Sequence, residues 1–271
     1  MNNIFISHTS AFEFLRYNRN DLTPTKLELT TACPDYSTKY PINSTATSLA
    51  PYNQILHSPI NLLMKNKNFT YKNSAYKFHI NKNTMPKNSF LKASPQIYIA
   101  SPELVFCELS EAFPFEKLML LGLELCGTYS ICEELESGFI TDCAPLTTPA
   151  KLKNFTKSLR KRQTNQKGIQ KATIAAEILE SQCASPQEAR LFTILASPRK
   201  FGGYGIKNIK LNNIIKLSDD SSKLCGQKII IPDLCIHSSK IAIEYDSDAF
   251  HENSMQNRRD KLRIDALTND G

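Results

Sequence analysis

Four carboxylates lie close together in the segment IAIEYDSDAFHE, residues 241–252. They are Glu244, Asp246, Asp248 and Glu252. Like charges at this density repel one another, so the segment needs a cation among its acids, either a metal ion or an arginine side chain. A metal ion would make the segment a ligand site, whereas arginine would make it an ion-pair network. The function of the protein depends on which cation is present.

A hairpin register groups these acids with one further aspartate. If Ser238 and Ser239 form a two-residue turn, Asp233 faces Glu244 across two antiparallel strands. Asp246 then follows on the same face. The opposite face carries only apolar or aromatic side chains, which are Leu234, Ile236, Ile241, Ile243 and Tyr245. Because a slip of one residue would mix the two faces, the sequence predicts a hairpin with an acidic side and an apolar side.

Another acid precedes the hairpin. Glu188 lies in the helix predicted for SPQEARLFTILAS, on the side expected to pack toward the strands. The same segment also forms a capping box, in which the Glu188 carboxylate accepts a hydrogen bond from the Ser185 amide. The sequence leaves both roles open for Glu188, a helix cap and a member of the acidic site.

The elements around these residues predict an α+β fold in three regions. Residues 1–101 should form a small helix-plus-β module, which fits a winged helix. Its helix is expected over HTSAFEFLRYN with Thr9 or Ser10 as the cap, and short strands are expected at INLLM, AYKFHI and QIYIA.

Residues 102–180 are predicted to be helical, with Ser101 as a cap and Gly127 as a stop. In residues 181–271, a helix precedes three strand-like segments, LNNIIKL, QKIIIPDLCI and KIAIEYD, and a charged helix follows them. The order α-β-β-β-α predicts an α/β sandwich built on a β-meander.

Positive charge is concentrated in the middle of the chain. The protein has 33 Lys and Arg against 26 Asp and Glu, a formal net charge of +7. Residues 151–171 contain eight Lys or Arg and no acid, a composition typical of a surface that binds nucleic acid phosphates. The cations expected to carry DNA binding are Lys157, Arg160, Lys161 and Arg162. The alternative is a solvated linker.

Four motifs resemble the PD-(D/E)XK nuclease superfamily, and they are SPQEARLF, IIIPDLCI, IAIEYDSDAFHE and RRDKLRIDAL. The likeness covers residues 185–271 and is nearest to very-short-patch-repair-like endonucleases. It implies a restriction-endonuclease-like α/β sandwich. Members of the family usually continue with another strand and helix beyond the position of Gly271, so the resemblance implies either a truncated sequence or a degenerate domain. Upstream, ISHTSAFEFLR and IASPELVFCELSEAF resemble AbiEi-antitoxin-like proteins, in which a winged helix precedes such a domain.

The resemblance implies a role for each acid. Asp233 matches the metal-binding aspartate, Glu244 the acid of the (D/E)XK strand and Glu188 the acid of the first helix. Asp246 occupies the position where many members have the lysine that orients the attacking water. His251 is the candidate for proton transfer, because imidazole titrates near neutrality, and a surface histidine at a helix start is the alternative.

The resemblance also implies Mg²⁺ or Mn²⁺ as the cofactor, since hard cations prefer oxygen ligands. Cations of the last helix are expected to contact the DNA backbone, or else to pair with neighbouring aspartates: Arg258, Arg259, Lys261 and Arg263. The function implied is a metal-dependent DNA endonuclease of bacterial defence or repair. The alternatives are a non-catalytic, antitoxin-like DNA-binding regulator with a partner toxin, and an interaction protein whose acids pair with arginines.

The remaining composition indicates a cytoplasmic protein. The eight cysteines form no C-x-x-C pair, so they are interpreted as small buried hydrophobes before zinc ligands. The longest apolar stretch, KLMLLGLELCG, falls short of the roughly 20 residues that cross a bilayer. The N-terminus lacks the pattern of a signal peptide.

Overall fold

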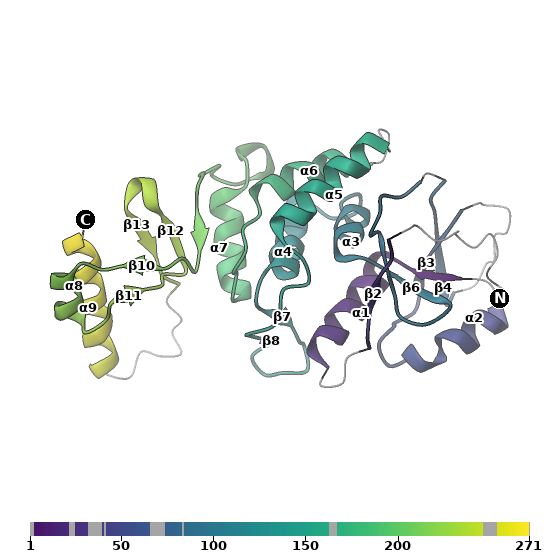
Figure 1. The fold of residues 1–271 in the computed structure, drawn as a ribbon, viewed down its shortest axis with the longest axis horizontal. Coiled ribbons are helices and arrows are strands. Elements are labelled where there is room, and N and C mark those ends of the chain that lie inside the picture. The colour runs from purple at the N-terminus through teal and green to yellow at the C-terminus, as the bar shows by residue number, and fades with distance from the viewer. Residues whose placement is uncertain are drawn as a thin grey trace. The chain divides into compact units, whose positions relative to one another are not determined.

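The computed structural model divides the chain into two compact units, residues 1–181 and residues 182–271 (Figure 1). We refer to them as the N-terminal unit and the C-terminal unit. Helices and strands occur in both, which confirms the predicted α+β class. The structure describes residues 3–21, 25–31, 40, 42–65, 74–82, 84–162, 167–245 and 254–270, with residues 42 and 254–260 described through their backbone only.

A six-stranded mixed sheet forms the centre of the N-terminal unit, in the order β2-β5-β6-β1-β3-β4. Its central strands β1, β3 and β6 are buried along their whole length, as expected where both faces of a sheet are covered. The six strands are β1 (Ile4–Ile6), β2 (Glu28–Leu29), β3 (Ile60–Met64), β4 (Tyr76–Ile80), β5 (Phe90–Lys92) and β6 (Ile97–Ala100). The three predicted strands are confirmed as β3, β4 and β6, and the winged-helix arrangement stays a prediction.

Helix α1 (His8–Asn20) leaves the end of β1 almost directly and packs on β3 and β6. The predicted cap at Thr9 or Ser10 is wrong, because the helix starts at His8 with Ser7 as its N-cap. The Ser10 side chain is buried and its Oγ accepts a hydrogen bond from the Asn61 amide at 3.0 Å. A second helical segment, α2 (Ile42–Leu49) and its 3-10 extension η1 (Ala50–Tyr52), follows β2.

Four helices complete the N-terminal unit, and they are α3 (Pro102–Leu109), α4 (Phe115–Cys126), α5 (Pro149–Arg162) and α6 (Ile169–Ile178). Both predicted boundary signals are confirmed. Ser101 Oγ accepts from the Leu104 amide at 3.3 Å, and Gly127 is the C-cap of α4. A short hairpin of β7 (Ser130–Ile131) and β8 (Phe139–Ile140) lies between α4 and α5.

The C-terminal unit departs from the predicted order α-β-β-β-α. Its central sheet is the antiparallel set β13-β12-β9, and β10 and β11 form a separate ladder. The predicted strand LNNIIKL is broken at Asn212, which has a φ of +47°, and QKIIIPDLCI is broken at Pro232, which has no amide to donate. The elements are α7 (Pro186–Ala196), η2 (Arg199–Phe201), β9 (Lys210–Leu211), β10 (Ile215–Lys216), α8 (Asp219–Cys225), β11 (Ile229–Ile230), β12 (Leu234–Ile236), η3 (His237–Ser239), β13 (Ile241–Ile243) and α9 (Ser254–Asp270).

Candidate functional site

The predicted hairpin register is confirmed. Strand β12 pairs antiparallel with β13, with Leu234 opposite Ile243, Cys235 opposite Ala242 and Ile236 opposite Ile241. The predicted turn at Ser238 and Ser239 is present as a 3-10 turn, because the Lys240 amide donates to the His237 carbonyl at 3.2 Å around these two residues. Lys240 closes the turn at a φ of +52°. The pairing follows the predicted register because each pair joins two residues whose side chains lie on the same face of the hairpin.

The register, continued by one pair, brings Asp233 opposite Glu244. Asp233 Oδ2 accepts a hydrogen bond from the Tyr245 amide at 2.6 Å, which ties the aspartate to the neighbouring chain. Two further members of the predicted site, Asp246 and His251, lie outside the described residues. The described part of the acidic face is therefore the Asp233–Glu244 pair.

An arginine accompanies Glu244. Arg263 Nη2 on α9 donates to Glu244 Oε1 at 2.9 Å, and both side chains are partly exposed, 32% for Arg263 and 45% for Glu244. Arg263 was predicted to contact DNA, and here it meets a carboxylate within the same unit. Arg258 and Arg259 also lie on α9, and their side chains are outside the described residues. Glu244 thus has an arginine as its cationic partner, which is one of the two alternatives that the sequence left open.

Glu188 serves as a helix cap. Its amide donates to Ser185 Oγ at 3.2 Å, and its Oε2 accepts from the Ala184 amide at 2.9 Å, one residue before the amide that a capping box would use. The same oxygen accepts from Asn212 Nδ2 at 2.6 Å. Because the Asn212 amide also donates to the Asp233 carbonyl at 2.9 Å, this asparagine connects the start of α7 to the start of β12.

The described acids do not assemble a metal site by themselves. No group of three or more His, Cys, Asp or Glu with a metal-binding arrangement occurs among the described residues. Glu188, Asp233 and Glu244 each have a protein partner for one carboxylate oxygen. A site with three ligands would need Asp246 or a rearrangement of these contacts.

The predicted apolar side of the hairpin is only half covered. Leu234 and Ile236 on β12 are buried, whereas Ile241 is 46% exposed and Tyr245 is 50% exposed. The difference follows from position, because β12 lies between two strands and β13 is at the end of the three-stranded order. This face is apolar in composition, but within the described residues only its side chains on the central strand β12 are buried.

The basic segment 151–171 covers α5 and α6. Helix α5 buries Leu152, Phe155, Thr156 and Leu159, and its six cations fall on the remaining faces. Five of these cations are exposed, and they are Lys151, Lys157, Arg160, Lys161 and Arg162. The first turn holds no acid and the last turn holds three consecutive cations, which the dipole of the helix favours at that end.

Three cations of this segment already have partners. Lys157 Nζ lies 3.7 Å from Glu177, and Lys167 Nζ lies 3.8 Å from Glu111. Lys171 Nζ donates to the Phe113 carbonyl. Of the other described cations of the segment, Lys151 and Lys153 lie near the start of α5, and Arg160, Lys161 and Arg162 lie in its last turn.

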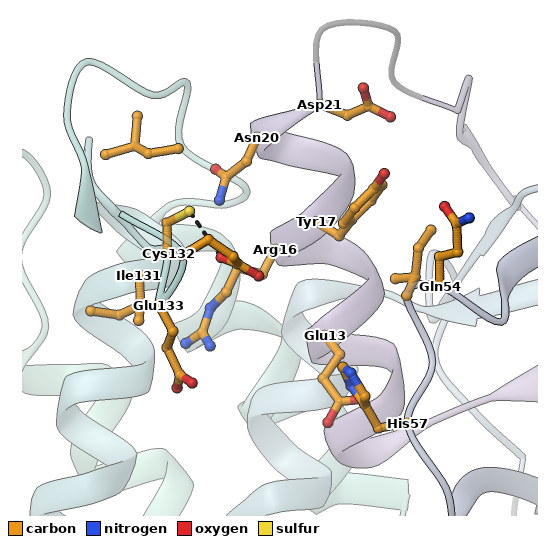
Figure 2. Close-up of a pocket in the computed structure, with 13 residues that line it drawn as sticks. Glu13, Arg16, Tyr17, Asn20, Asp21, Gln54, His57, Ile131, Cys132 and Glu133 are labelled. Carbon is orange, nitrogen blue, oxygen red and sulfur yellow. Dashed lines mark hydrogen bonds and ion pairs between the residues drawn. The ribbon is translucent and has the colours of Figure 1, made fainter. Parts of the chain in front are cut away.

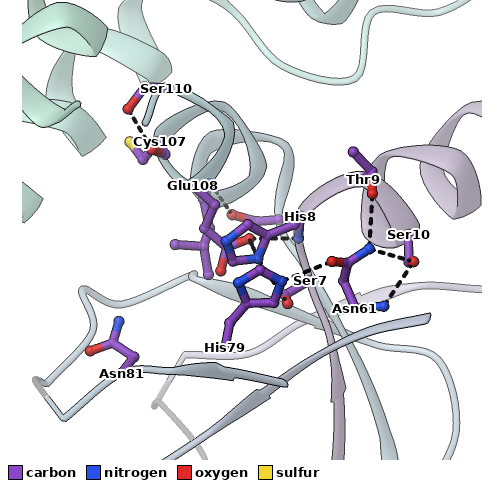
Figure 3. Close-up of polar contacts among 12 residues, drawn as sticks. Ser7, His8, Thr9, Ser10, Asn61, His79, Asn81, Cys107, Glu108 and Ser110 are labelled. Carbon is purple, nitrogen blue, oxygen red and sulfur yellow. Dashed lines mark hydrogen bonds and ion pairs between the residues drawn. The ribbon is translucent and has the colours of Figure 1, made fainter. Parts of the chain in front are cut away.

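A buried polar cluster at the start of α1 was missed from the sequence (Figure 3). The His8 amide donates to Glu108 Oε2 at 2.8 Å, and the His8 ring stacks on the His79 ring with centroids 3.5 Å apart. His79 Nε2 lies 2.8 Å from Asn61 Oδ1. Burial lowers the pKa of His8 to about 3 and that of His79 to about 4, and it raises the pKa of Glu108 to about 8. Both imidazoles are thus neutral at pH 7, and His8 and Glu108 do not form an ion pair.

Four of the described cysteines are buried, in agreement with their interpretation as small hydrophobes: Cys107, Cys126, Cys183 and Cys235. Burial raises the pKa of each thiol. None of the helices within the described residues is long and apolar enough to span a bilayer. Comparisons with family models, curated proteins and solved structures found no match to this chain.

Proposed function

We propose that this protein binds DNA and that its C-terminal unit is a nuclease-like scaffold, as in an antitoxin-like regulator. The observation that carries the proposal is the exposed basic surface of α5. Its last turn places Arg160, Lys161 and Arg162 together on the surface. Cations gathered without acids release counterions when they bind phosphates, which supplies sequence-independent affinity.

The contacts of the acids favour the scaffold over catalysis. Glu188 caps α7 and holds Asn212, Asp233 accepts from a backbone amide, and Glu244 pairs with Arg263. Each contact stabilises a carboxylate without a metal ion. In addition, the sequence has Asp246 where many nucleases of the resembled superfamily carry a lysine. These features together support the proposal of a restriction-endonuclease-like fold without catalytic activity.

The second candidate function is that of a Mg²⁺- or Mn²⁺-dependent DNA endonuclease. The register that brings Asp233 opposite Glu244 favours it, because two carboxylates on adjacent strands can share one cation. Asp233, Glu244, Asp246 and Glu188 would hold the ion. When bound, it would supply an acidified water and charge neutralisation at a phosphate. Arg263 would then have to release Glu244.

DNA binding is tested by fluorescence anisotropy on a mixed-sequence duplex over a range of salt concentrations. The triple variant Arg160→Gln, Lys161→Gln, Arg162→Gln should bind more weakly, and its slope of log K against log salt should fall by about 2 to 3. The matched control replaces three exposed lysines of the same unit, Lys26, Lys65 and Lys87, by Gln. Equal affinity and slope in wild type and triple variant would show that α5 is only a solvated helix.

Nicking of supercoiled plasmid distinguishes the two candidate functions. The scaffold proposal expects no Mg²⁺- or Mn²⁺-dependent nicking by the purified wild type. Nicking that disappears in Asp233→Ala, while the variant still unfolds cooperatively, would establish the endonuclease instead. Nicking that persists in Asp233→Ala would indicate a contaminating nuclease.

A further inference from the structure

A glycine-rich loop follows helix α7 in the C-terminal unit, with the sequence RKFGGYGIK over residues 199–207. It begins with the 3-10 turn η2 and contains two aromatic residues, three cations and no acid. The loop belongs neither to the basic surface of α5 nor to the acids of the hairpin. Its composition calls for a separate explanation.

The backbone of this loop is fixed against the end of α7. Each amide of residues 201–206 donates a hydrogen bond to a carbonyl of residues 194–199, at 2.8 to 3.4 Å. Gly203 allows the close approach, because a Cβ at this position would lie 2.2 Å from the Ser197 carbonyl oxygen. Since these six amides are all used within the protein, they cannot cradle a phosphate as the amides of nucleotide-binding loops do. The loop therefore presents its side chains to a partner.

The side chain of Tyr204 is exposed on this fixed backbone. The residue is 66% exposed, although its own amide donates to the Ile194 carbonyl at 3.0 Å. Ile194 and Ile206 are exposed as well, and the Ile206 amide is fixed by the Leu195 carbonyl. An aromatic side chain on a rigid backbone loses little conformational freedom when a partner covers it. The loop thus holds Tyr204 in place for a contact with a partner.

Positive charge accompanies this tyrosine. Residues 189–218 contain six Lys or Arg and no acid. Three of these cations lie in the loop itself and are exposed, and they are Arg199, Lys200 and Lys207. Within the described residues, neither Arg199 nor Lys207 has an acid at ion-pair distance. Lys200 Nζ lies 5.0 Å from the centroid of the Phe201 ring. The loop can therefore meet an anion without first breaking an ion pair.

An exposed ring among such cations fits a nucleic acid strand with unpaired bases. The phosphates of the strand are attracted by the cations, and every base has a flat face that can stack on an aromatic ring. In a duplex, neighbouring base pairs cover these faces, so the ring would have no base to stack on. An acidic peptide would satisfy the cations, but stacking on a flat ring favours the bases of a nucleic acid.

We propose that this loop binds single-stranded DNA, with the ring of Tyr204 stacked on one base and with Arg199 and Lys207 at neighbouring phosphates. The proposed role of the loop rests on the proposed DNA binding and adds a second contact surface, on the C-terminal unit. The two surfaces differ in what they recognise. Helix α5 buries its one aromatic residue, Phe155, so it offers cations to the phosphates of any strand. The loop adds a preference for unpaired bases.

Fluorescence anisotropy with the full chain tests the loop. The probes are a thymidine strand of about 15 nucleotides and the mixed-sequence duplex. Tyr204→Ala should weaken binding of the single strand about tenfold, the loss expected for one stacked base, and should change binding of the duplex little. Tyr204→Phe should keep the affinity, because stacking needs the ring and not the hydroxyl.

Salt dependence separates stacking from charge. The double variant Arg199→Gln, Lys207→Gln should lower the slope of log K against log salt for the single strand by about 1 to 1.5. Tyr204→Ala should leave that slope unchanged, because the ring carries no charge. The variant removes an exposed side chain and keeps all six amide bonds of the loop, so it should unfold as cooperatively as the wild type in circular dichroism.

The matched control is Tyr17→Ala. Tyr17 is also exposed, but it lies on α1 beside a cavity of about 740 Å³ whose lining includes Glu13, Asp21 and Glu133 (Figure 2). Acidic side chains repel phosphates, so this replacement should leave binding of the single strand unchanged.

The outcomes distinguish the loop from the proposed function. A wild type that binds neither probe would overturn both proposals. A wild type that binds the duplex, with single-strand binding that is absent or unaffected by Tyr204→Ala, would overturn only the role of the loop. Tighter Tyr204-dependent binding of the matching RNA strand, or displacement of the DNA strand by an equal charge of poly-glutamate, would also overturn it.

Discussion

Carboxylates are held differently in the two units. In the N-terminal unit, Glu108 and Glu124 are buried and accept from donors that other elements fix in place. In the C-terminal unit, Glu244 is 45% exposed and meets Arg263, another partly exposed side chain. The comparison teaches that the buried acids are part of the architecture, whereas the exposed pair can exchange partners at small cost. A ligand or metal ion would therefore compete more readily for the acids of the hairpin.

The largest effect should come from breaking the buried pair of the N-terminal unit. Glu124→Ala leaves Arg16 without its bidentate partner and the Ile131 amide without an acceptor. We expect the free energy of unfolding to fall by about 3 kcal/mol, measured by urea unfolding. Glu177→Ala, which removes an exposed acid paired with Lys157, is the control and should cost less than about 1 kcal/mol. Similar losses in the two variants would contradict the comparison.

The pH dependence of stability should report the buried cluster at the start of α1. Burial lowers the pKa of His8 and His79 from 6.5 and raises that of Glu108 from 4.5 to about 8. The histidines therefore destabilise the fold as the pH falls below 6.5, and Glu108 destabilises it as the pH rises from 4.5 toward 8. Of these three groups only Glu108 acts between pH 6.5 and 8, where stability should drop by about 2 kcal/mol.

Urea unfolding at several pH values checks this expectation. Glu108→Gln should remove the decline between pH 6.5 and 8 and keep the decline below pH 6.5. The double replacement of His8 and His79 by Asn and Gln should do the reverse. An unchanged decline above pH 6.5 in Glu108→Gln would show that this carboxyl is not the responsible group.

A smaller effect is expected at the cap of α7. Ser185→Ala removes the acceptor for the Glu188 amide and should lower the free energy of unfolding of the C-terminal unit by about 1 kcal/mol. Ser158→Ala is the control, since Ser158 lies inside α5 away from its ends. Circular dichroism during denaturation measures both. A loss no larger than that of the control would mean that Glu188 and Asn212 alone hold the helix start.

The smallest effect belongs to the exposed pair. Arg263→Ala should cost less than about 1 kcal/mol, because solvent and salt screen a pair of this exposure. A loss above about 2 kcal/mol would be of the size seen for buried pairs. It would show that the contact between Arg263 and Glu244 stabilises the fold as strongly as the buried pairs do. The scaffold proposal also expects Mg²⁺ to leave the Tm of both proteins unchanged.

Local pattern explains which elements the sequence could predict. The hairpin register followed from alternation along residues 233–245, and the limits of α3 and α4 followed from Ser101 and Gly127. Helix α8 was missed although its signals were present, with Ser218 as the cap, two aspartates in the first turn and Gly226 at the end. The seven residues of the helix are too few to show an apolar period.

Long-range contacts explain what the sequence could not predict. His8 and Glu108 are one hundred residues apart, and nothing in the spacing of either residue indicates their hydrogen bond. The ion pair between Arg16 and Glu124 likewise joins residues far apart in the sequence, and it depends on which segments cover α1. For the acids of the hairpin, the sequence indicated a cation partner but could not choose Arg263, because that choice depends on how α9 packs.

Asn212 shows how one position can limit what mutation may change. Its backbone takes a φ of +47°, its amide donates to the Asp233 carbonyl, and its side chain donates to both the Gln182 carbonyl and Glu188. Glycine would keep the backbone and lose the side-chain bonds. Aspartate, nearest in shape, has no donor when ionised and would repel Glu188. In a saturation mutagenesis of the C-terminal unit, this position should tolerate almost no replacement, with aspartate worse than glycine.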